Sequence, residues 1–442
     1  MAIATVPYYK TAGDGHECPI ADMRYGKAIK SSGSLIGKLF LMMLIMPFFP
    51  VFADAMTPEI GIVRAEQYSE RAGTRERVLP GTLIFAERQA YSPFQNTLHR
   101  YPDRPLFLDV SLRGSKDGMT RNQRGFIHDL KILGDCGLDG FGAIAYYGIN
   151  ADNRRILERF APFDGYSQMI VLSPGSDLAN YTSTKTMILD AARSRYTTRI
   201  NGKIVMWTYG GGRTAPKLVK RMREDKDIPP FLLIGEMPFY DLFKAYGYDD
   251  HGRYDPSCTD ISQEKISAFR EKVAEYLSSV DGVRIWCTNR QWSHLGEYPA
   301  KELPTPVYRK YLLPIYKDVL SRKEFKDKLV CAYVRQGYIN HFSGTTDGEW
   351  GTATLRCKLD EIALLNPDIL MCFEWNELNE NTHFQPTVAH AKTYSRILNH
   401  YRSVFDRTPP KPMKGDDPAI PNLVVSVRQA LRLGEPSRPS EI

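Results

Sequence analysis

The chain contains 442 residues, 25% of them charged and 43% hydrophobic, and carries a formal net charge of +7 at pH 7. This charge is small for the length, and the sequence contains no arginine-rich block, so composition argues against a nucleic-acid partner. None of the seven cysteines belongs to a Cys-x-x-Cys pair, which argues against a zinc site.

Residues 1–55 are expected to form an export signal rather than part of the folded domain. Residues 39–52 are 14 consecutive uncharged, largely apolar residues, preceded by four basic residues and followed by Ala53-Asp54-Ala55. This order matches the basic, apolar and small-residue regions of a secretory signal. The apolar run is shorter than the roughly 20 residues that span a membrane as a helix. We therefore predict a secreted or periplasmic protein, with an uncleaved envelope anchor as the alternative.

Beyond residue 104, short apolar runs alternate with stretches whose apolar residues recur every three or four positions. Such runs are typical of strands buried on both faces, and the stretches between them of amphipathic helices. The predicted strands are 106–112, 140–147, 168–172, 203–209, 231–236, 283–287, 329–334 and 368–373. The helices predicted to follow them are 121–134, 152–160, 184–194, 216–224, 263–279, 308–321, 354–365 and 390–404.

Eight strand–helix units in succession favour an α/β fold of the (β/α)8 TIM-barrel type over a doubly wound sheet. We expect a single catalytic domain over residues 101–406. A polar N-terminal extension, residues 56–100, is expected to cap the bottom of the barrel, and residues 407–442 form a proline-rich tail.

The last predicted strand ends in a polar segment that indicates a ligand-binding or catalytic site. Three carboxylates and two amides lie within residues 374–380. Buried unpaired carboxylates are costly, so polar groups at a buried strand end are expected to face a ligand. Glu377 and Glu380 are three residues apart, and a turn would place both around one cleft. Two carboxylates in different environments are what hydrolysis of a glycosidic bond requires. The alternative is a surface turn with solvated acids.

Aromatic and hydrogen-bonding residues recur at the predicted carboxyl ends of the strands, where barrels of this type bind their substrates. Sugars present hydroxyl edges and apolar C–H faces, which suit rings beside amides and carboxylates. For any single ring, core packing is the alternative, and Asp109 has an equally good structural interpretation. The candidate substrate-binding residues are Asp109, Tyr147, Trp207, Tyr209, Glu236, Trp292, Tyr333, Arg335, Tyr338 and Asn376.

Nucleotide and metal motifs are missing from the sequence. Gly210-Gly211-Gly212 lacks the Lys-Ser/Thr of a phosphate-binding loop, and a flexible loop is the better interpretation. No His-Glu-x-x-His, Gly-x-Ser-x-Gly or calcium-loop pattern is present. We therefore predict neither a cofactor nor a metal.

Residues 375–386 resemble the Asn-Glu-Trp-x-Glu-Gly-Thr-x-x-Glu-Pro signature of glycoside hydrolase family 99, and also the Trp-Asn-Asp-x-x-Glu segment of family 71. Residues 137–141 resemble the Gly-Ile-Asp-Gly-Phe segment of these groups. The resemblance implies a secreted or lumenal (β/α)8 enzyme that acts on α-linked mannose or glucose polymers. The matching residues are Asn376, Glu377, Glu380, Thr382 and Pro386, and the departures are Leu378, Asn381 and Gln385.

We predict a secreted, metal-independent glycoside hydrolase that is endo-acting on an α-linked polysaccharide, either an α-mannan or an α-glucan. The alternative is a non-catalytic glycan-binding barrel, favoured by the three departures from the signature. Glu380 is the candidate general acid/base. Glu377, flanked by Asn376, is the candidate partner that activates water or, as family 99 implies, the substrate's own 2-hydroxyl. Trp207 and Trp292 are expected to stack on sugars. The residues expected to position the substrate are Glu236, Tyr333, Arg335 and Tyr338.

Overall fold

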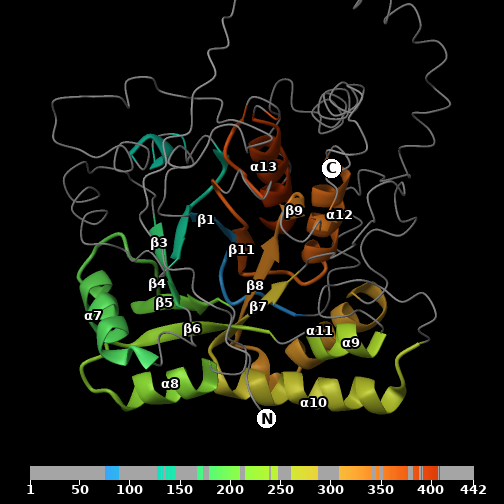
Figure 1. Ribbon diagram of the computed structural model, residues 1–442, viewed down its shortest axis with the longest axis horizontal. Coiled ribbons are helices and arrows are strands. Elements are labelled where there is room, and N and C mark those ends of the chain that lie inside the picture. Colours follow the sequence, from blue (N-terminus) through green and yellow to red (C-terminus); the bar gives the residue numbers. More distant parts are fainter. Residues whose placement is uncertain are drawn as a thin grey trace, which may run out of the picture. The chain divides into compact units, whose positions relative to one another are not determined.

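Eight parallel strands form one curled sheet, and helices lie on its outer side (Figure 1). The strands follow one another around the sheet in chain order, β3 pairs with β5, and the last strand pairs with the first. Each therefore has a parallel neighbour on both sides, an arrangement that fits a (β/α)8 fold. The strands are β1 Leu83–Arg88, β2 Gly140–Ile144, β3 Ser167–Leu172, β5 Lys203–Thr208, β6 Phe231–Glu236, β7 Gly282–Trp286, β8 Leu329–Val334 and β11 Ile369–Cys372.

Shorter strands and seven α-helices complete the described elements. β4 (Arg199–Ile200) runs antiparallel to β5, and β9 (Tyr338–Asn340) pairs with β10 (Thr345–Asp347). The helices are α7 Tyr181–Ala192, α8 Ala215–Glu224, α9 Tyr240–Tyr246, α10 Gln263–Ser279, α11 Leu313–Leu320, α12 Ala353–Ala363 and α13 Thr393–Asp406. A π-helical turn, Tyr308–Leu312, precedes α11, and a 3₁₀ turn, Lys323–Phe325, follows it.

The computed structural model describes residues 75–88, 127–130, 132, 136–144, 167–172, 179–209, 215–237, 240–246, 260–286, 308–340, 345–347, 352–376, 382–387, 390, 392–406 and 408. All of them belong to one unit, Gly61–Ile442. The predicted export signal and, apart from Thr408, the predicted tail lie outside these residues. Within the described ranges, no helix has both the length and the apolar character needed to cross a membrane.

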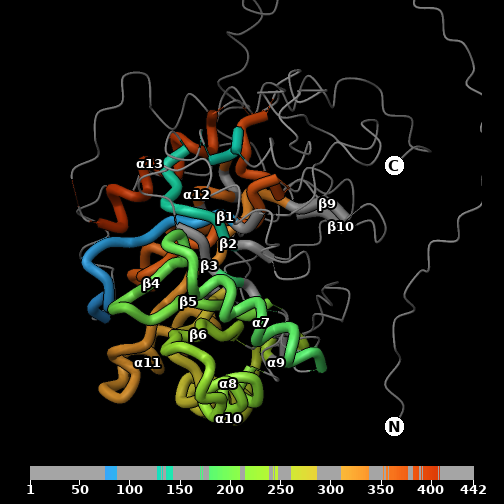
Figure 2. The backbone as a smooth tube through the Cα atoms, turned by 90° about the vertical axis from the view of Figure 1, so that its left-hand side faces the viewer, coloured from blue at the N-terminus to red at the C-terminus, as the bar shows by residue number. Residues whose placement is uncertain are grey.

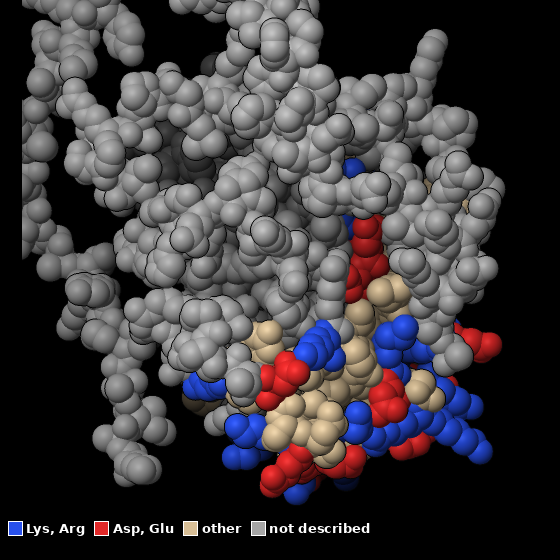
Figure 3. Space-filling view, turned by 90° about the vertical axis from the view of Figure 1, so that its right-hand side faces the viewer, with Lys and Arg blue, Asp and Glu red and all other residues tan. Residues whose placement is uncertain are grey.

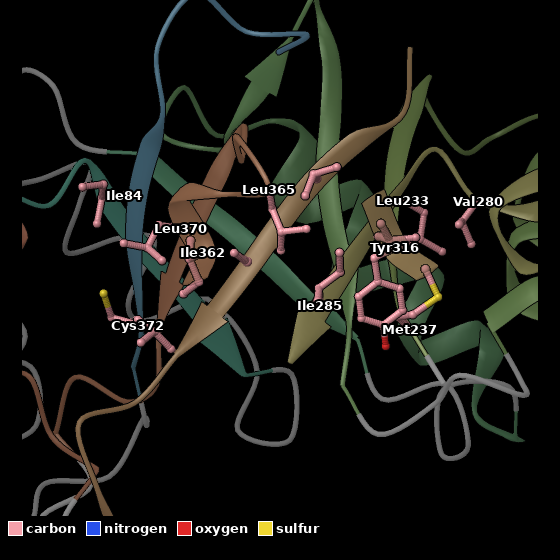
Figure 4. Packing of buried hydrophobic residues seen from close by; sticks show 14 of the residues in the cluster. Ile84, Leu233, Met237, Val280, Ile285, Tyr316, Ile362, Leu365, Leu370 and Cys372 are labelled. Atoms are coloured by element: carbon pink, nitrogen blue, oxygen red, sulfur yellow. The ribbon is translucent and has the colours of Figure 1, made fainter. Parts of the chain in front are cut away.

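Alternating side chains of the strands divide the core into two clusters. In β8, Leu329, Cys331 and Tyr333 belong to the cluster on the inner face of the curled sheet, whereas Val330, Ala332 and Val334 face the helices. Because both faces are buried, the strand is apolar throughout, as parallel strands require. Figure 4 shows part of the outer cluster, where Ile285 of β7 lies beside Tyr316 of α11, and Leu370 of β11 lies beside Ile362 of α12.

The helix expected at residues 263–279 is confirmed as α10, and its sequence explains both its start and its packing. The side-chain oxygen of Ser262 accepts a hydrogen bond from the backbone N–H of Lys265, which caps the first turn. The buried residues Ile266, Phe269, Val273 and Leu277 recur every three or four positions and so form one apolar face.

The first strand of the sheet differs from the prediction. β1, Leu83–Arg88, lies between β2 and β11, although residues 56–100 were expected to precede the barrel. Figure 2 shows this segment, in blue, beside strands from the other end of the sequence. Only Leu83–Ala86 is apolar before Glu87 and Arg88 interrupt the pattern, so the strand signal is short. The strand expected at 106–112 lies outside the described residues.

The chain before β1 is attached to the amino ends of β8 and β11. The buried carboxylate of Asp368 accepts hydrogen bonds from Arg75 Nη2 (2.5 Å) and from the backbone N–H groups of Val78 (2.6 Å), Leu79 (3.0 Å) and Val330 (2.9 Å). The segment Arg75–Leu79 therefore covers this end of the sheet.

The outer surface carries charges of both signs. Lys and Arg are interspersed with Asp and Glu on the described part of the face shown in Figure 3. Several of these charges are paired, as in Lys310 with Asp260 (2.5 Å) and Arg270 with Asp318 (3.0 Å). Mixed charges of this kind produce no strong single-sign field over the described face.

Candidate active site

Arg284, at the centre of β7, is fully buried and enclosed by side chains on the inner face of the sheet. Its Cζ atom lies 4.7 Å, 5.3 Å and 4.8 Å from the ring centroids of Trp207, Tyr209 and Tyr333. Its Nη2 atom lies 2.9 Å from Oε1 of Glu236. A buried cation is costly unless it is compensated. Here one carboxylate and the faces of three aromatic rings supply that compensation.

The strands place this group near their carboxyl ends. Trp207 is the second-last residue of β5, Glu236 the last of β6 and Tyr333 the second-last of β8. Trp207 and Tyr333 belong to the inner cluster, and the parallel ladder aligns Glu236 with Arg284. In (β/α)8 folds, the carboxyl ends of the strands hold the active site.

Phe373 extends the aromatic group to the end of β11. Its ring centroid lies 4.9 Å from that of Tyr333 and 6.3 Å from that of Tyr209, with which it is nearly parallel. The backbone N–H of Phe373 donates to the carbonyl oxygen of Val334 (2.8 Å). The peptide bond between Phe373 and Glu374 is cis. Phe373 thus connects the rings around Arg284 to the polar segment that follows β11.

Two stretches of that polar segment are held together by backbone hydrogen bonds. The N–H of Glu374 donates to the carbonyl oxygen of Thr382 (2.5 Å), and the N–H of Phe384 donates to that of Glu374 (2.8 Å). The N–H of Gln385 likewise donates to the carbonyl oxygen of Trp375 (2.8 Å). Residues 382–385 therefore lie beside residues 374 and 375.

Glu236 interacts with residues of both strands that flank β6, namely β5 and β7. Its backbone N–H donates to Oγ1 of Thr208 (3.0 Å), and its carboxylate faces Arg284. Tyr276 of α10 packs against the outer side of the strand at Gly235. Burial raises the pKa of Tyr276 well above its ordinary value, and the negative charge of Glu236 raises it further. The Tyr276 hydroxyl therefore stays protonated at neutral pH.

Four of the predicted site residues come together in this group, namely Trp207, Tyr209, Glu236 and Tyr333. Asn376 is buried after the end of β11, and Arg335 is buried just after β8, where its carbonyl oxygen accepts a hydrogen bond from Lys358 Nζ (3.2 Å). Tyr338 begins β9, but its side chain is outside the description. The other predicted residues, Asp109, Tyr147, Trp292, Glu377 and Glu380, lie outside the described residues.

Trp207 has a different environment from the one its predicted stacking role needs. Its side chain has an exposed fraction of 0%, with Arg284 over its ring and the ring of Tyr333 6.1 Å away. Its ring therefore presents no surface to a sugar in this structure and contributes to the enclosure of Arg284. Tyr209, by contrast, is only half-buried.

Arg284 and Phe373 were missed by the sequence analysis. The available signal for Arg284 was a cation in the middle of the apolar run Val283-Arg284-Ile285, within a strand expected to be buried on both faces. A charge at such a position needs a buried partner. Phe373 was assigned only to the strand, since nothing in its neighbours along the chain indicates the rings that it contacts.

An open groove of about 620 Å³ lies on the outer side, between α7 and α8. Within it, Lys185 pairs with Asp225 (2.9 Å) and Asp227 (2.5 Å), and these hydrogen bonds raise the pKa of Lys185 to about 12. The guanidinium of Arg221 covers the ring of Tyr181. Lys185, Asp225 and Arg221 of this groove are therefore engaged with neighbouring side chains. Within the described part of the chain, no group of three or more His, Cys, Asp or Glu side chains is arranged to hold a metal ion.

Among solved structures, a glycoside hydrolase-like protein has a TM-score of 0.47 and 12% identity, and the alignment covers 76% of this chain and 98% of that protein. Two structures of the GH99 endo-alpha-mannosidase from Bacteroides thetaiotaomicron, one in complex with BIS-TRIS-propane, have TM-scores of 0.46 with 11% and 12% identity. They cover 74% of this chain and 99% and 98% of the mannosidase. No protein-family model and no curated protein matches the chain. The chain is similar to these proteins along most of its length.

Proposed function

We propose that this protein is a glycoside hydrolase that cleaves an α-linked polysaccharide, α-mannan or α-glucan, at internal bonds. One observation carries the proposal: the motif Trp375-Asn376-Glu377-Leu378-Asn379-Glu380 follows β11 after Phe373 and Glu374, where the ring of Phe373 belongs to a buried aromatic group. A pair of carboxylates at the carboxyl end of a strand in this type of sheet suits acid/base chemistry on a glycosidic bond.

The proposed roles follow from the two carboxylates' order along the chain. Glu380 acts as general acid, protonates the leaving glycosidic oxygen and then acts as base. Glu377, next to the buried Asn376, activates the nucleophile, either water or the substrate's 2-hydroxyl. Glu236 accepts hydrogen bonds from sugar hydroxyls, and Tyr209, whose ring is half-buried, contacts the sugar.

Two further proposals concern the whole chain. The β1–β11 and β3–β5 ladders support closure of the sheet into a complete (β/α)8 barrel. The apolar run at residues 39–52, preceded by basic residues, supports export from the cytoplasm.

The activity is tested by incubating the protein with α-mannans and α-glucans and measuring new reducing ends. On a cleaved substrate, Glu377→Gln and Glu380→Gln are each expected to lower the rate by about 10²–10⁴, because each removes a positioned acid or base. Glutamine keeps the side-chain volume, so thermal unfolding should stay unchanged. Glu224→Gln, at an exposed position on α8, is the matched control and should keep full activity.

Three outcomes separate the possibilities. Binding to a glycan without cleavage of any member of the panel would favour the non-catalytic glycan-binding barrel. Near-full activity of both variants would place the catalytic carboxylates elsewhere, with Asp109 and Glu236 tested next. Neither binding nor cleavage would contradict the proposed function altogether.

A further inference from the structure

A buried arginine such as Arg284 is not expected to add much to the stability of the fold. Its guanidinium has no exposed surface, and its ion-pair partner Glu236 is itself buried. Removing two charges from water costs about as much as their attraction returns, so apolar residues of similar volume are often at least as stabilising. We propose that Arg284 is a positioning residue of the candidate active site, and this inference rests on the proposed glycoside hydrolase function.

The contacts of Arg284 extend to three other strands, β5, β6 and β8. Its planar guanidinium lies over rings from β5 and β8 and beside the Glu236 carboxylate of β6. A planar group with several N–H donors can engage a carboxylate and aromatic faces at the same time, which an ammonium group does less well. Arg284 therefore holds Glu236 at a set distance from the aromatic group.

The same contacts extend to Phe373, at the start of the polar segment that follows β11. Tyr209 and Tyr333 both contact the guanidinium, and both contact Phe373, the residue before Glu374. Arg284 thus links the side chain proposed to bind sugar hydroxyls with the base of the segment that carries Glu377 and Glu380. Because its own surface is fully covered, it acts through these neighbours and does not touch the substrate.

The test compares four variants on a substrate that the wild-type protein cleaves. Arg284→Met is expected to lower kcat/KM by about 10²-fold, the scale of a misplaced binding group, with most of the change in KM. Glu236→Gln should lower it to a similar extent. The double variant Arg284→Met/Glu236→Gln should be no worse than either single variant, because the two residues act as one unit. Arg284→Lys keeps the positive charge but lacks the planar guanidinium. Its kcat/KM should lie between those of the wild-type protein and Arg284→Met.

Thermal unfolding separates positioning from stability. Arg284→Met leaves Glu236 buried without its cation and should lower Tm, whereas the double variant removes both charges and should recover most of the loss. Positioning predicts that Tm recovers while kcat/KM does not. Arg75→Met, which breaks the buried pair with Asp368 at the opposite end of the strands, is the matched control. It should lower Tm but keep kcat/KM when assayed below its Tm.

The outcomes are distinct for the two proposals. If the wild-type protein cleaves a glycan and the double variant regains both Tm and kcat/KM, this inference is overturned and the proposed function stands. A wild-type kcat/KM for Arg284→Met would overturn it equally. If the wild-type protein neither cleaves nor binds any glycan of the panel, the proposed function fails and this inference fails with it.

Discussion

Asp368 and Arg284 are both buried and charged, but their partners differ in kind. Asp368 accepts hydrogen bonds from three backbone N–H groups and from Arg75, all at the amino ends of the strands. Arg284 is compensated by one carboxylate and by aromatic faces near the carboxyl ends. The first arrangement ties the chain before β1 to β8 and β11, which is a structural task. The second orients side chains around the candidate active site.

Replacing Asp368 with asparagine should lower the free energy of unfolding by about 3–5 kcal/mol, because Arg75 would lose its buried partner. One amide oxygen also cannot replace the two carboxylate oxygens that these donors use. The loss is measured by urea unfolding. Asp318→Asn, at a half-exposed carboxylate paired with Arg270, is the control and should change the free energy by less than about 1 kcal/mol. Equal losses for both variants would contradict the structural role of Asp368.

At the scale of the elements, β6 and α10 approach each other closely because of a glycine. A Cβ atom at Gly235 would lie 2.3 Å from the Tyr276 hydroxyl oxygen and 2.9 Å from Val280 Cγ1. Neither neighbour can move far, since both are buried in the outer cluster. The absence of a side chain at residue 235 thus sets how near the helix lies to the strand that carries Glu236.

Gly235→Ala is therefore expected to destabilise the protein by about 1–3 kcal/mol through overpacking. Tyr276→Phe removes the atom nearest to the added methyl group, so the double variant should lose less than the sum of the single losses. We expect a coupling of at least about 0.5 kcal/mol in a double-mutant cycle measured by chemical unfolding. Additive losses would show that Tyr276 is not the limiting contact.

At the scale of the whole molecule, the sheet joins the two ends of the described chain. β1 pairs with β11, so Leu83 lies opposite Ile369 although 286 residues separate them in the sequence. The side chain of Asp406, at the end of α13, accepts a hydrogen bond from the backbone N–H of Thr82 (2.9 Å). Because the two ends complete one sheet, we expect the fold to form as a unit.

A chain shortened to begin at residue 101, the predicted start of the barrel, should not unfold cooperatively. It lacks β1, and Asp368 and Asp139 lose their hydrogen-bond partners before and within that strand. A chain that begins at Gly61 retains them and should unfold like the full-length protein. Circular dichroism during heating measures both transitions. A cooperative transition of the shorter chain would show that β1 is dispensable.

Local signals were sufficient for most of the elements. Seven of the eight parallel strands match the predicted ranges, because strands buried on both faces are apolar throughout and turn residues bound them. α10 was equally predictable from its apolar spacing. β1 was not, since its four apolar residues form too short a run to distinguish it from a loop. β1 is held in the sheet by β2 and β11, and these neighbours cannot be inferred from its own short apolar run.

Patterns within one segment were enough to predict the alternation of strands and helices, the candidate carboxylates Glu377 and Glu380 and the ring residues at strand ends. Which of those rings meet, and what they enclose, depends on tertiary contacts. The partners of Arg284 come from β5, β6 and β8, and the sequence around Arg284 indicates that it needs a buried partner but not which strands supply one. Trp207 shows the consequence, since an aromatic residue at a strand end is a sugar platform or a cover for a buried cation depending on what packs against it.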